Sequence, residues 1–512
     1  ARGLAMSTVN YAQLWQLALP QVIVVVAALI ALAVDLLLLR ARATQTRFTV
    51  AAILGSLGCI LAIGRIVLSP AQANVLDGTL LANPLTHLVQ IALLVLAIVT
   101  LLMATNSGFT EHVGEFVLLV LVATVGSMFL VSSQDLLVIF ISLELLSLSL
   151  YILTAFDKHR PHSSEAALKY FLFGGMSAAF LLFGFSLLYG LSNSTSLPRI
   201  ADTIHASAAA GSPLNPLLLI AIVTTVIGFG FKVAAFPFHF WAPDVYQGAP
   251  APSAAFIASS SKVASFFIFF QVLAVGFAGA EGSAAWLHFT TGWVPVLAVV
   301  AALSMVLGNL VAIVQSSVRR LLAYSAIAHA GYMLLAIVAH TQQSLGALLY
   351  YVFTYALATL GAFGVVSIVE QQTGGDRLAH FDGLSRRAPV LSACMFVFLL
   401  SLAGIPPLAG FFGKFYLFVS VLHSGPGLLW LIVLAIAMSA VSLYYYLQVL
   451  KRIYVANPSD TVANASADAT TIRTPILSQA IVVLLAAGVV LFGCAPHLLL
   501  HWIDGAIRTA GF

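Results

Sequence analysis

Residues 228–244 read GFGFKVAAFPFHFWAPD, and this stretch decides the fold. Lys232 stands inside an apolar segment of helical length, and Pro237 follows five residues later. Because proline removes a backbone hydrogen bond, we expect the helix to break there. The stretch 402–418, LAGIPPLAGFFGKFYLF, likewise combines a double proline with Lys414. Ionisable side chains beside broken apolar helices are typical of proteins that move ions across membranes.

The composition of the whole chain indicates a membrane protein. Hydrophobic residues make up 61% and charged residues 7% of the 512 residues. A water-soluble fold could not bury this much apolar surface, whereas a bilayer solvates it directly. The net charge of +4 comes from short loops, so no nucleic-acid partner is indicated. The three cysteines lack CxxC spacing and predict no disulfide framework, metal site or iron–sulfur cluster.

Apolar runs of the length that crosses a bilayer, about 20 residues, predict an all-α polytopic membrane protein. The fourteen expected spans are 15–39, 48–69, 85–104, 115–131, 135–155, 165–190, 215–240, 251–277, 293–314, 320–339, 344–370, 388–421, 428–450 and 476–500. The chain starts without methionine and shows no signal-peptide pattern. We therefore expect the first span to be retained, with Met6 as a candidate start.

The basic residues predict the orientation of the spans. Thirteen Lys and Arg residues fall in loops after odd-numbered spans, and three fall on the other side. Since cytoplasmic loops carry the excess of positive charge, both termini are expected on the non-cytoplasmic side. The expected location is the inner membrane of a bacterium.

An internal repeat relates two parts of the chain. Glu144 precedes Lys232 by 88 residues, and His329 precedes Lys414 by 85. This spacing predicts two five-helix units, spans four to eight and nine to thirteen, each with a broken helix. Because five is odd, the second unit should be inverted relative to the first. The expected domains are a three-helix segment (1–114), two repeats that each supply a proton half-channel (115–277 and 293–450), and a loop with a C-terminal helix (451–512).

Five side chains are the main candidates for a proton relay: Glu144, Lys232, Lys262, His329 and Lys414. A buried lysine can be neutral or charged, because desolvation and a nearby carboxylate act on it in opposite directions. Glu144 has no basic residue at helical spacing in its own span, so we expect Lys232 to be its partner. The alternative for these residues is a structural ion pair that fixes helix packing.

Four further residues are weaker candidates. Lys169 is a possible relay, but Glu165 at i−4 also allows a local ion pair. His239 could admit protons or cap the broken helix. Tyr355 and Tyr444 occupy repeat positions that hold lysines in the first unit.

Four stretches resemble the antiporter-like membrane subunits of respiratory complex I, the proton-pumping NADH:quinone oxidoreductase. They are SLELLSLSLYILTAF (142–156), PFHFWAPDVYQGAPAP (237–252), RRLLAYSAIAHAGYMLL (319–335) and SLAGIPPLAGFFGKFYLF (401–418). The likeness covers spans four to thirteen and is greatest for subunit N. Subunit M typically has glutamate where Lys414 stands, and subunit L typically continues into a long lateral helix that is not expected here.

The resemblance implies an order of events along the relay. Protons would enter at the pair of Glu144 and Lys232, pass Lys262 and His329, and leave from Lys414. It also implies partners, namely neighbouring antiporter-like and small membrane subunits, and membrane lipids. NADH, FMN, iron–sulfur clusters and quinone are then expected in other subunits, and no cofactor or metal in this chain.

Three functions remain open from the sequence. The first is a proton-translocating subunit of NADH:quinone oxidoreductase, in which Lys169 matches an additional span-six lysine of subunit N. The second is a subunit of a multi-subunit cation/proton antiporter, and the third a structural subunit that does not conduct. The sequence contains no NAD, flavin or iron–sulfur motif, so oxidoreductase activity would belong to the complex and not to this polypeptide.

Overall fold

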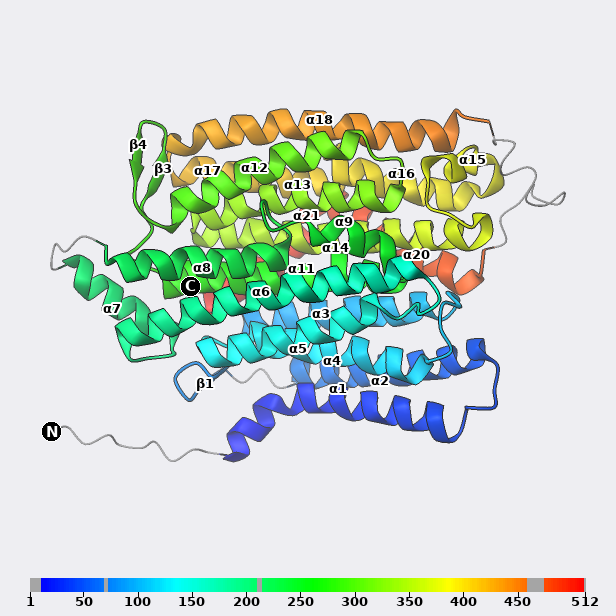
Figure 1. The fold of residues 1–512 in the computed structure, drawn as a ribbon, viewed down its shortest axis with the longest axis horizontal. Coiled ribbons are helices and arrows are strands. Elements are labelled where there is room, and N and C mark those ends of the chain that lie inside the picture. Colours follow the sequence, from blue (N-terminus) through cyan, green and yellow to red (C-terminus); the bar gives the residue numbers. More distant parts are fainter. Residues whose placement is uncertain (1–10, 69–71, 210–213, 458–473, 511–512) are drawn as a thin grey trace.

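The structure, a computed structural model, describes residues 11–68, 72–209, 214–457 and 474–510. Long helices run side by side through the bundle (Figure 1). Within the described residues, 13 helices are long and apolar enough to cross a membrane. The remaining predicted span is divided into α16 (Pro389–Ala403) and α17 (Ala409–Ser424), which are too short to count singly. The prediction of an all-α polytopic membrane protein is confirmed.

The first part of the chain holds three spanning helices and a β-hairpin. They are α1 (Tyr11–Leu37), α2 (Thr44–Leu68), β1 (Ala73–Val75), β2 (Leu80–Ala82) and α3 (Pro84–Ala104). Asn83 begins α3 with a capping box, since its side chain accepts a hydrogen bond from the Thr86 N–H at 2.8 Å. This cap fixes the point where the chain leaves the hairpin and enters the bundle. Met6, the expected start, lies outside the described residues.

The next part corresponds to the first predicted repeat. Its elements are α4 (Val113–Val131), α5 (Leu136–Thr154), α6 (Pro161–Ser192), α7 (Leu197–Ala209), α8 (Pro216–Val233), α9 (Trp241–Gly248), α10 (Ala251–Ala258), α11 (Ser260–Gln271) and the π-helical turn η1 (Val272–Gly276). α8 and α9 are the two halves of the broken span. α7 is not among the predicted spans, because its 13 residues are too few and too polar to cross a bilayer.

The second predicted repeat follows a second hairpin. Its elements are β3 (Ser283–Ala285), β4 (His288–Thr290), α12 (Trp293–Ile313), α13 (Val318–Ala339), α14 (Gln342–Thr373), η2 (Leu378–Phe381), α15 (Leu384–Arg387), α16, α17, η3 (Pro426–Leu428) and α18 (Leu429–Tyr454). Figure 1 shows α8 leading to α9 from left to right, whereas α16 leads to α17 from right to left. The two broken helices therefore run in opposite directions.

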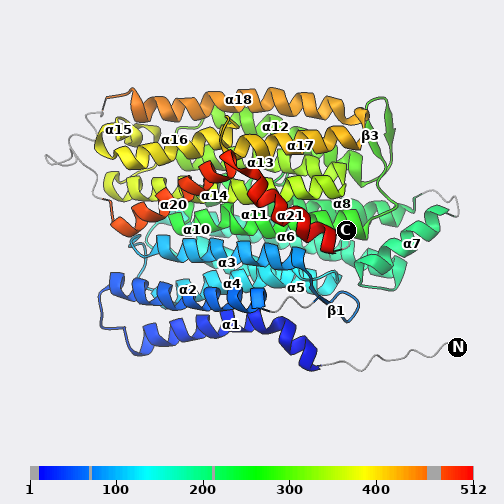
Figure 2. The ribbon, with the colours of Figure 1, turned by 180° about the vertical axis from the view of Figure 1, so that it is seen from behind.

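The end of the chain differs from the prediction. The last span was expected over 476–500, but α20 (Ile476–Cys494) stops earlier and α21 (Pro496–Ala510) begins two residues later. Proline disfavours a helical conformation in the residue before it, and Ala495 has φ −130° and ψ 64°. Behind the bundle, α21 lies against α3 and α14 (Figure 2).

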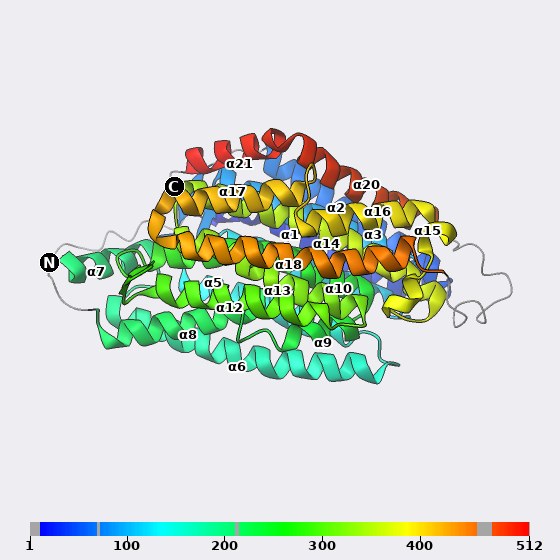
Figure 3. The same ribbon diagram turned by 90° about the horizontal axis from the view of Figure 1, so that it is seen from above.

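The centre of the bundle is made by few helices. In an apolar stretch of 18 residues across α10 and α11, 100% of the residues are buried inside the protein, and in the corresponding stretches of α13 and α14 the share is 94%. In the corresponding stretches of α1, α6 and α18, only 28%, 33% and 22% of the residues are buried. Figure 3 shows α6 and α8 at one edge of the bundle and α20 and α21 at the opposite edge. A polar residue in α11 or in the middle of α13 or α14 is therefore surrounded by protein on all sides.

The bundle has two distinct ends. Both hairpins and α7 lie at one end, here called the hairpin end (Figure 1). The α1–α2 and α5–α6 connections and α15 lie at the other, here called the basic end, because the described basic loop residues concentrate there. The distribution agrees with the predicted number and direction of the spans.

Candidate functional site

The first halves of both broken helices end in the same way. α8 is followed by Ala234 with φ +59°, and α16 by Gly404 with φ +87°. In each case the next N–H donates to the carbonyl five residues earlier, at 2.8 and 3.0 Å, as in a Schellman motif. If Ala234 is aligned with Gly404, Leu402 of α16 takes the position that Lys232 has in α8. Lys232 therefore precedes its break, whereas Lys414 follows its own.

Lys232 lies in the last turn of α8 and is 8% exposed. Its Nζ donates a hydrogen bond to the hydroxyl of Ser147 in α5. The same atom lies 5.8 Å from the ring centre of Tyr151 and 5.5 Å from that of Phe231. Aromatic rings attract a nearby cation, so the amine is held by a neutral acceptor and two rings.

Glu144 was the expected partner of Lys232, but the structure does not pair them directly. Glu144 lies three residues before Ser147, on the same side of α5. It is only partly buried, and no ion pair among the described residues includes it. Ser147 takes the place of the carboxylate at the amine, and Glu144 lies about one helical turn away.

Lys262 lies in α11 and is 2% exposed. Its Nζ donates to the carbonyl oxygen of Ala326 in α13 at 2.7 Å. The amine also lies 5.4 Å from the ring centre of Tyr355 in α14. The three most buried helices thus meet at this one amine.

His329 lies in α13 and has a hydroxyl at each ring nitrogen. Nδ1 is 2.6 Å from the Tyr351 hydroxyl, and Nε2 is 3.2 Å from the Tyr446 hydroxyl. The Tyr446 hydroxyl continues to Ser325 of α13. A hydroxyl both donates and accepts, so either tautomer of the imidazole finds a partner on each side.

Lys414 lies in α17 and is 4% exposed. Its Nζ donates to the carbonyl oxygens of Leu402 at 3.1 Å and Ala403 at 3.0 Å, and to the Ser439 hydroxyl at 2.8 Å. These carbonyls belong to the last turn of α16, where no further helical N–H is available. The second broken helix thus uses its freed carbonyls to bind a lysine from its own other half.

Aromatic side chains join Lys262, His329 and Lys414. The Tyr355 ring, which contacts Lys262, lies 5.0 Å from the His329 ring between centres. The Tyr332 ring lies 5.8 Å from the His329 ring and 5.0 Å from the Lys414 amine. We call these five residues, with Tyr351 and Tyr446, the central cluster. The predicted candidate Tyr355 is part of it.

Three members of the central cluster were not predicted: Tyr332, Tyr351 and Tyr446. Tyr332 follows His329 by three residues, and Tyr351 precedes Tyr355 by four, so helical spacing could have placed them on the same faces. Tyr446 has no such signal. The Tyr332 hydroxyl accepts a hydrogen bond from the Asn309 side chain at 3.0 Å, which fixes its position.

Buried hydroxyls without a hydrogen-bond partner among the described residues occur on α8 and α11, which carry Lys232 and Lys262, and on α10. They are Thr225 of α8, Ser253 of α10, and Ser260 and Ser265 of α11. Buried polar groups in proteins are almost always hydrogen-bonded, often to ordered water. The helices that carry the two lysines therefore offer sites where water molecules can bind.

Two weak candidates lie apart from the central cluster. His239 stands between the rings of Phe236 and Phe240, with centres 5.6 and 4.6 Å away, and its Nδ1 has no partner among the described residues. α9 has no side-chain cap, so His239 does not cap it. Tyr444 is 54% exposed, while Tyr446 of the same helix is buried.

Lys169 forms the local ion pair that was the alternative to a relay. Its Nζ lies 2.8 Å from Glu165 and 2.7 Å from Asp244 of α9, and the side chain is 40% exposed. Arg320 of α13 binds the other oxygen of Asp244 at 2.7 Å. Lys169 thus belongs to a group of charges at the basic end and not to the central cluster.

The same charges connect α9 to α13 and α14. Glu370 of α14 binds both Arg160, at 2.9 Å, and Arg319. The Arg319 guanidinium also donates to the carbonyl oxygens of Gln247 and Ala249 at the end of α9. Arg160 and Glu370, together with Asp244 and its neighbours Glu165 and Arg320, line a cavity of about 390 Å³, and Arg319 and Lys169 are bonded to these lining residues. We call them the ion-pair cluster.

Replacing Asp244 with asparagine is expected to lower stability at neutral pH. Burial raises the pKa of Asp244, but hydrogen bonds from Lys169 and Arg320 outweigh it and hold the pKa below its ordinary value. A carboxyl whose pKa is lowered by folding stabilises the fold above its unfolded-state pKa, and this contribution disappears as the pH falls through the folded-state value.

The expected loss for Asp244→Asn is roughly 1 kcal/mol at pH 7, because the pair is partly exposed. It should shrink as the pH falls below the unfolded-state pKa of about 3.9 and through the lower folded-state pKa, because the native carboxyl is then protonated as well. Thermal unfolding of the purified protein at pH 7 and over a series of acidic pH values measures this difference. Asp202→Asn, which changes an exposed carboxylate of α7, is the control. Equal melting of the two variants at pH 7 would contradict the prediction.

The sequence matches known proteins along most of its length. The profile of the family described as NADH:quinone oxidoreductase/Mrp antiporter, TM, matches residues 133–439. NADH-quinone oxidoreductase subunit N 2 of Acidobacterium capsulatum is 54% identical over 509 residues, which cover 97% of this chain and 100% of the relative. NADH-quinone oxidoreductase subunit N of Desulforamulus reducens is 39% identical, covering 84% of this chain and 87% of the relative.

Solved structures show the same fold. A chain of respiratory complex I from Thermus thermophilus with bound aureothin superposes with a TM-score of 0.75 at 34% identity, covering 94% of this chain and 98% of that one. A chain of the Mrp complex from Dietzia sp. reaches a TM-score of 0.80, covering 96% of this chain and 97% of that one, at only 19% identity. The second likeness concerns the fold alone.

Profile, sequence and structure agree with the resemblance seen in the four motifs. The matched profile spans more than half of the chain and includes both broken helices. Both relatives from Acidobacterium capsulatum and Desulforamulus reducens are named as subunit N of NADH-quinone oxidoreductase. The chain therefore belongs to the transmembrane family of NADH:quinone oxidoreductases and Mrp antiporters, and within it to subunit N of NADH-quinone oxidoreductase.

Proposed function

We propose that this chain moves protons across the membrane through the central cluster, driven by electron transfer in other subunits of the complex. The observation that carries the proposal is the connection between Lys262 and Lys414. Both amines are buried, and His329 lies between them with a tyrosine ring toward each lysine. Ionisable groups are rare inside membranes and usually serve transport.

The contacts of the lysines support a mobile proton. Lys262 and Lys414 bind carbonyl oxygens and a hydroxyl, and no carboxylate among the described residues contacts them. An amine that is not held in an ion pair is free to pass its proton to a neighbouring group. Imidazole and hydroxyl groups are suited to receive it, because each can donate and accept.

The proposed route crosses the bundle from α5 and α8 to α17. Protons enter near Glu144 and Lys232, cross to Lys262 by water at the unpaired hydroxyls, pass His329 and leave from Lys414. In this proposal residues 115–277 and 293–450 are inverted repeats that each form a half-channel. The shared geometry of the two breaks and their opposite directions support the repeat.

Membership of the family supports a proposal for the setting of the chain. We place the chain in a bacterial inner membrane, with the basic end in the cytoplasm and both termini on the other side. Neighbouring antiporter-like and small membrane subunits, and lipids, surround it. NADH, FMN, iron–sulfur clusters and quinone belong to other subunits of the complex.

A matched pair of tyrosine variants tests the route. Tyr446→Phe removes the hydroxyl that binds His329 and Ser325, whereas Tyr444→Phe removes one that faces outward on the same helix. The first change should slow proton transfer through this chain about tenfold, and the second should leave it unchanged. Proton uptake per NADH oxidised by the complex in sealed vesicles measures both.

Two other functions make different predictions. A cation/proton antiporter subunit shares this fold, as the Mrp chain shows, but would purify without flavin or iron–sulfur proteins. A structural subunit would tolerate Tyr446→Phe and Tyr444→Phe equally. Purification of the complex with a tagged copy of this chain, followed by flavin and iron analysis, distinguishes the first case, and the vesicle assay distinguishes the second.

A further inference from the structure

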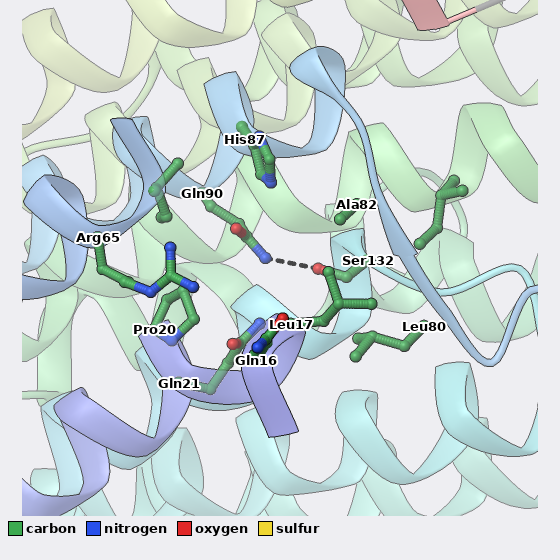
Figure 4. Close-up of a pocket in the computed structure, with 12 residues that line it drawn as sticks. Gln16, Leu17, Pro20, Gln21, Arg65, Leu80, Ala82, His87, Gln90 and Ser132 are labelled. Carbon is green, nitrogen blue, oxygen red and sulfur yellow. Dashed lines mark hydrogen bonds between the residues drawn. The ribbon is translucent and has the colours of Figure 1, made fainter. Parts of the chain in front are cut away.

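A small polar pocket lies at the hairpin end, outside both predicted repeats. Figure 4 shows that α1, α2 and α3 enclose it together with β2. Arg65 enters from the last turn of α2, His87 from the first turn of α3, and Gln16 and Gln21 from α1. None of these residues belongs to the proposed proton route.

The pocket is positively charged and has no internal counter-charge. Its lining includes one guanidinium, one imidazole and three side-chain amides, but no carboxylate. Arg65 forms no ion pair with any described residue. An arginine inside a membrane bundle normally finds a carboxylate, a carbonyl or a lipid headgroup. This arginine faces the pocket instead.

One side-chain amide oxygen in the pocket is buried and has no hydrogen-bond partner among the described residues. Gln21 is 1% exposed, and its Oε1 has no hydrogen-bond partner among the described residues. The neighbouring amide of Gln90 is fixed, since its Nε2 donates to the Ser132 hydroxyl at 2.6 Å and to the Met128 carbonyl oxygen at 3.3 Å. A buried polar group without a partner requires explanation, and a bound polar ligand or water supplies one.

The size of the pocket limits what can bind. The cavity has a volume of about 20 Å³ and holds little more than one water molecule. A larger ligand would therefore insert one polar group and lie across the mouth. An elongated molecule with a small charged end fits this description.

The surroundings of the mouth are those of a lipid. Trp15, next to Gln16 in α1, is 61% exposed, and exposed tryptophans concentrate at the level of lipid headgroups. Leu61 and Leu57 precede Arg65 by one and two helical turns on the same face of α2, and they are 63% and 50% exposed. An apolar stripe thus runs from the arginine toward the middle of the membrane.

We propose that this pocket binds the phosphate of an anionic phospholipid. Arg65 pairs with the phosphate, and the side-chain amide of Gln16 donates to a phosphate oxygen. The Oε1 of Gln21, unpaired among the described residues, accepts a hydrogen bond from a headgroup hydroxyl, and an acyl chain lies along Leu61 and Leu57. The guanidinium group of an arginine can donate two parallel hydrogen bonds to phosphate oxygens. Basic pockets between transmembrane helices are known to bind anionic lipid headgroups. The lipid would fasten α1 to α2 and α3 at the hairpin end.

Photolabelling of the intact complex in nanodiscs tests the proposal. The probe is phosphatidylglycerol with a diazirine beside its headgroup, and labelled peptides from α1 to α3 are quantified by mass spectrometry. A diacylglycerol with the same diazirine lacks the phosphate and is the control probe. We expect the phosphatidylglycerol probe to label the hairpin-end peptides about tenfold more than the diacylglycerol, as a charge-assisted hydrogen bond implies.

Substitutions of Arg65 and Arg42 test whether the labelling depends on the pocket. Arg65→Gln should lower labelling by phosphatidylglycerol to the level of the diacylglycerol, and Arg65→Lys should keep most of it. Arg42→Gln, at the opposite end of the α1–α2 pair, is the matched control and should change nothing at the hairpin end. The comparison of the two probes on the wild-type complex stands even where a variant fails to assemble.

Each remaining outcome overturns the proposal. Equal labelling by both probes would show acyl packing without phosphate recognition. Loss of labelling in excess inorganic phosphate would identify a free-anion site. Absence of label from this region in the intact complex would show that another subunit covers the pocket, and unchanged labelling in Arg65→Gln would remove the arginine from the site.

Discussion

Replacing Lys232 with alanine should reduce proton transfer through this chain by about a hundredfold, the usual scale for losing a positioned proton carrier. Lys232 is the ionisable side chain of the last turn of α8, and alanine leaves only the Ser147 hydroxyl and two rings at that point. The chain should still assemble, because the helix break is fixed by backbone hydrogen bonds and not by the amine. Protons moved per NADH oxidised in sealed vesicles report the loss.

Two further variants separate proton transfer from general damage. Lys158→Ala removes an exposed lysine from the α5–α6 connection and should behave as wild type. Ser147→Ala keeps the amine but removes its acceptor, so it should have a smaller effect than Lys232→Ala. A Lys232→Ala complex that moves the wild-type number of protons per NADH would exclude the route through α8.

The spans and the buried lysines could be predicted from the sequence, because the free energy of placing a residue in a bilayer depends mainly on its type. A bilayer accepts long apolar runs and penalises charge, so Lys232, Lys262 and Lys414 stand out in any apolar segment. The breaks could be predicted as well, since proline interrupts a helix whatever surrounds it. A helix that is apolar on every side has no polar face, so its sequence does not show which side chains point toward the centre of the bundle.

The tyrosines of α18 show this limit. Tyr444, Tyr445 and Tyr446 are consecutive, so at most some of them can face the centre. The repeat spacing favoured Tyr444, yet the structure turns Tyr446 toward His329 and leaves Tyr444 54% exposed. The rotation of α18 is set by its packing against α12 and α16, which no local pattern in the sequence records.

The ion pairs show a second limit, which is distance along the chain. Glu165 is four residues from Lys169 and was found from helical spacing, whereas Asp244 is 75 residues away and was not. Glu144 has no basic residue at helical spacing in its own span, so Lys232 of another span was its expected partner, but α5 presents Ser147 to the amine instead. Charges that meet only in the folded bundle need the relative depth of two helices, and span boundaries alone do not give it.

The two breaks share one backbone design but use it differently. At the first, the lysine stands before the break and reaches another helix, α5. At the second, the lysine stands after the break and reaches back to the carbonyl oxygens of Leu402 and Ala403. Because Leu402 is the residue opposite Lys232 in the aligned breaks, both amines lie at corresponding turns of the two halves. The two lysines thus stand at different sequence positions relative to breaks of the same backbone geometry.

Lys414→Arg should block release of protons although it keeps the positive charge. The guanidinium does not lose its proton at accessible pH, so a relay through this position would stop. The arginine has room, since a cavity of about 250 Å³ lies beside Lys414, between α17 and α18. It also keeps acceptors, because the Leu402 and Ala403 carbonyls and the Ser439 hydroxyl remain in reach of a longer donor.

The comparison of Lys414→Arg with Lys414→Met separates charge from proton exchange. If the positive charge only fixed the broken helix, arginine would restore what methionine loses. If the amine must release its proton, both variants should lower proton transfer by about a hundredfold, while thermal unfolding shows that the arginine chain is the more stable of the two. Wild-type proton transfer in the arginine variant would reduce Lys414 to a structural charge and end the proposed route at His329.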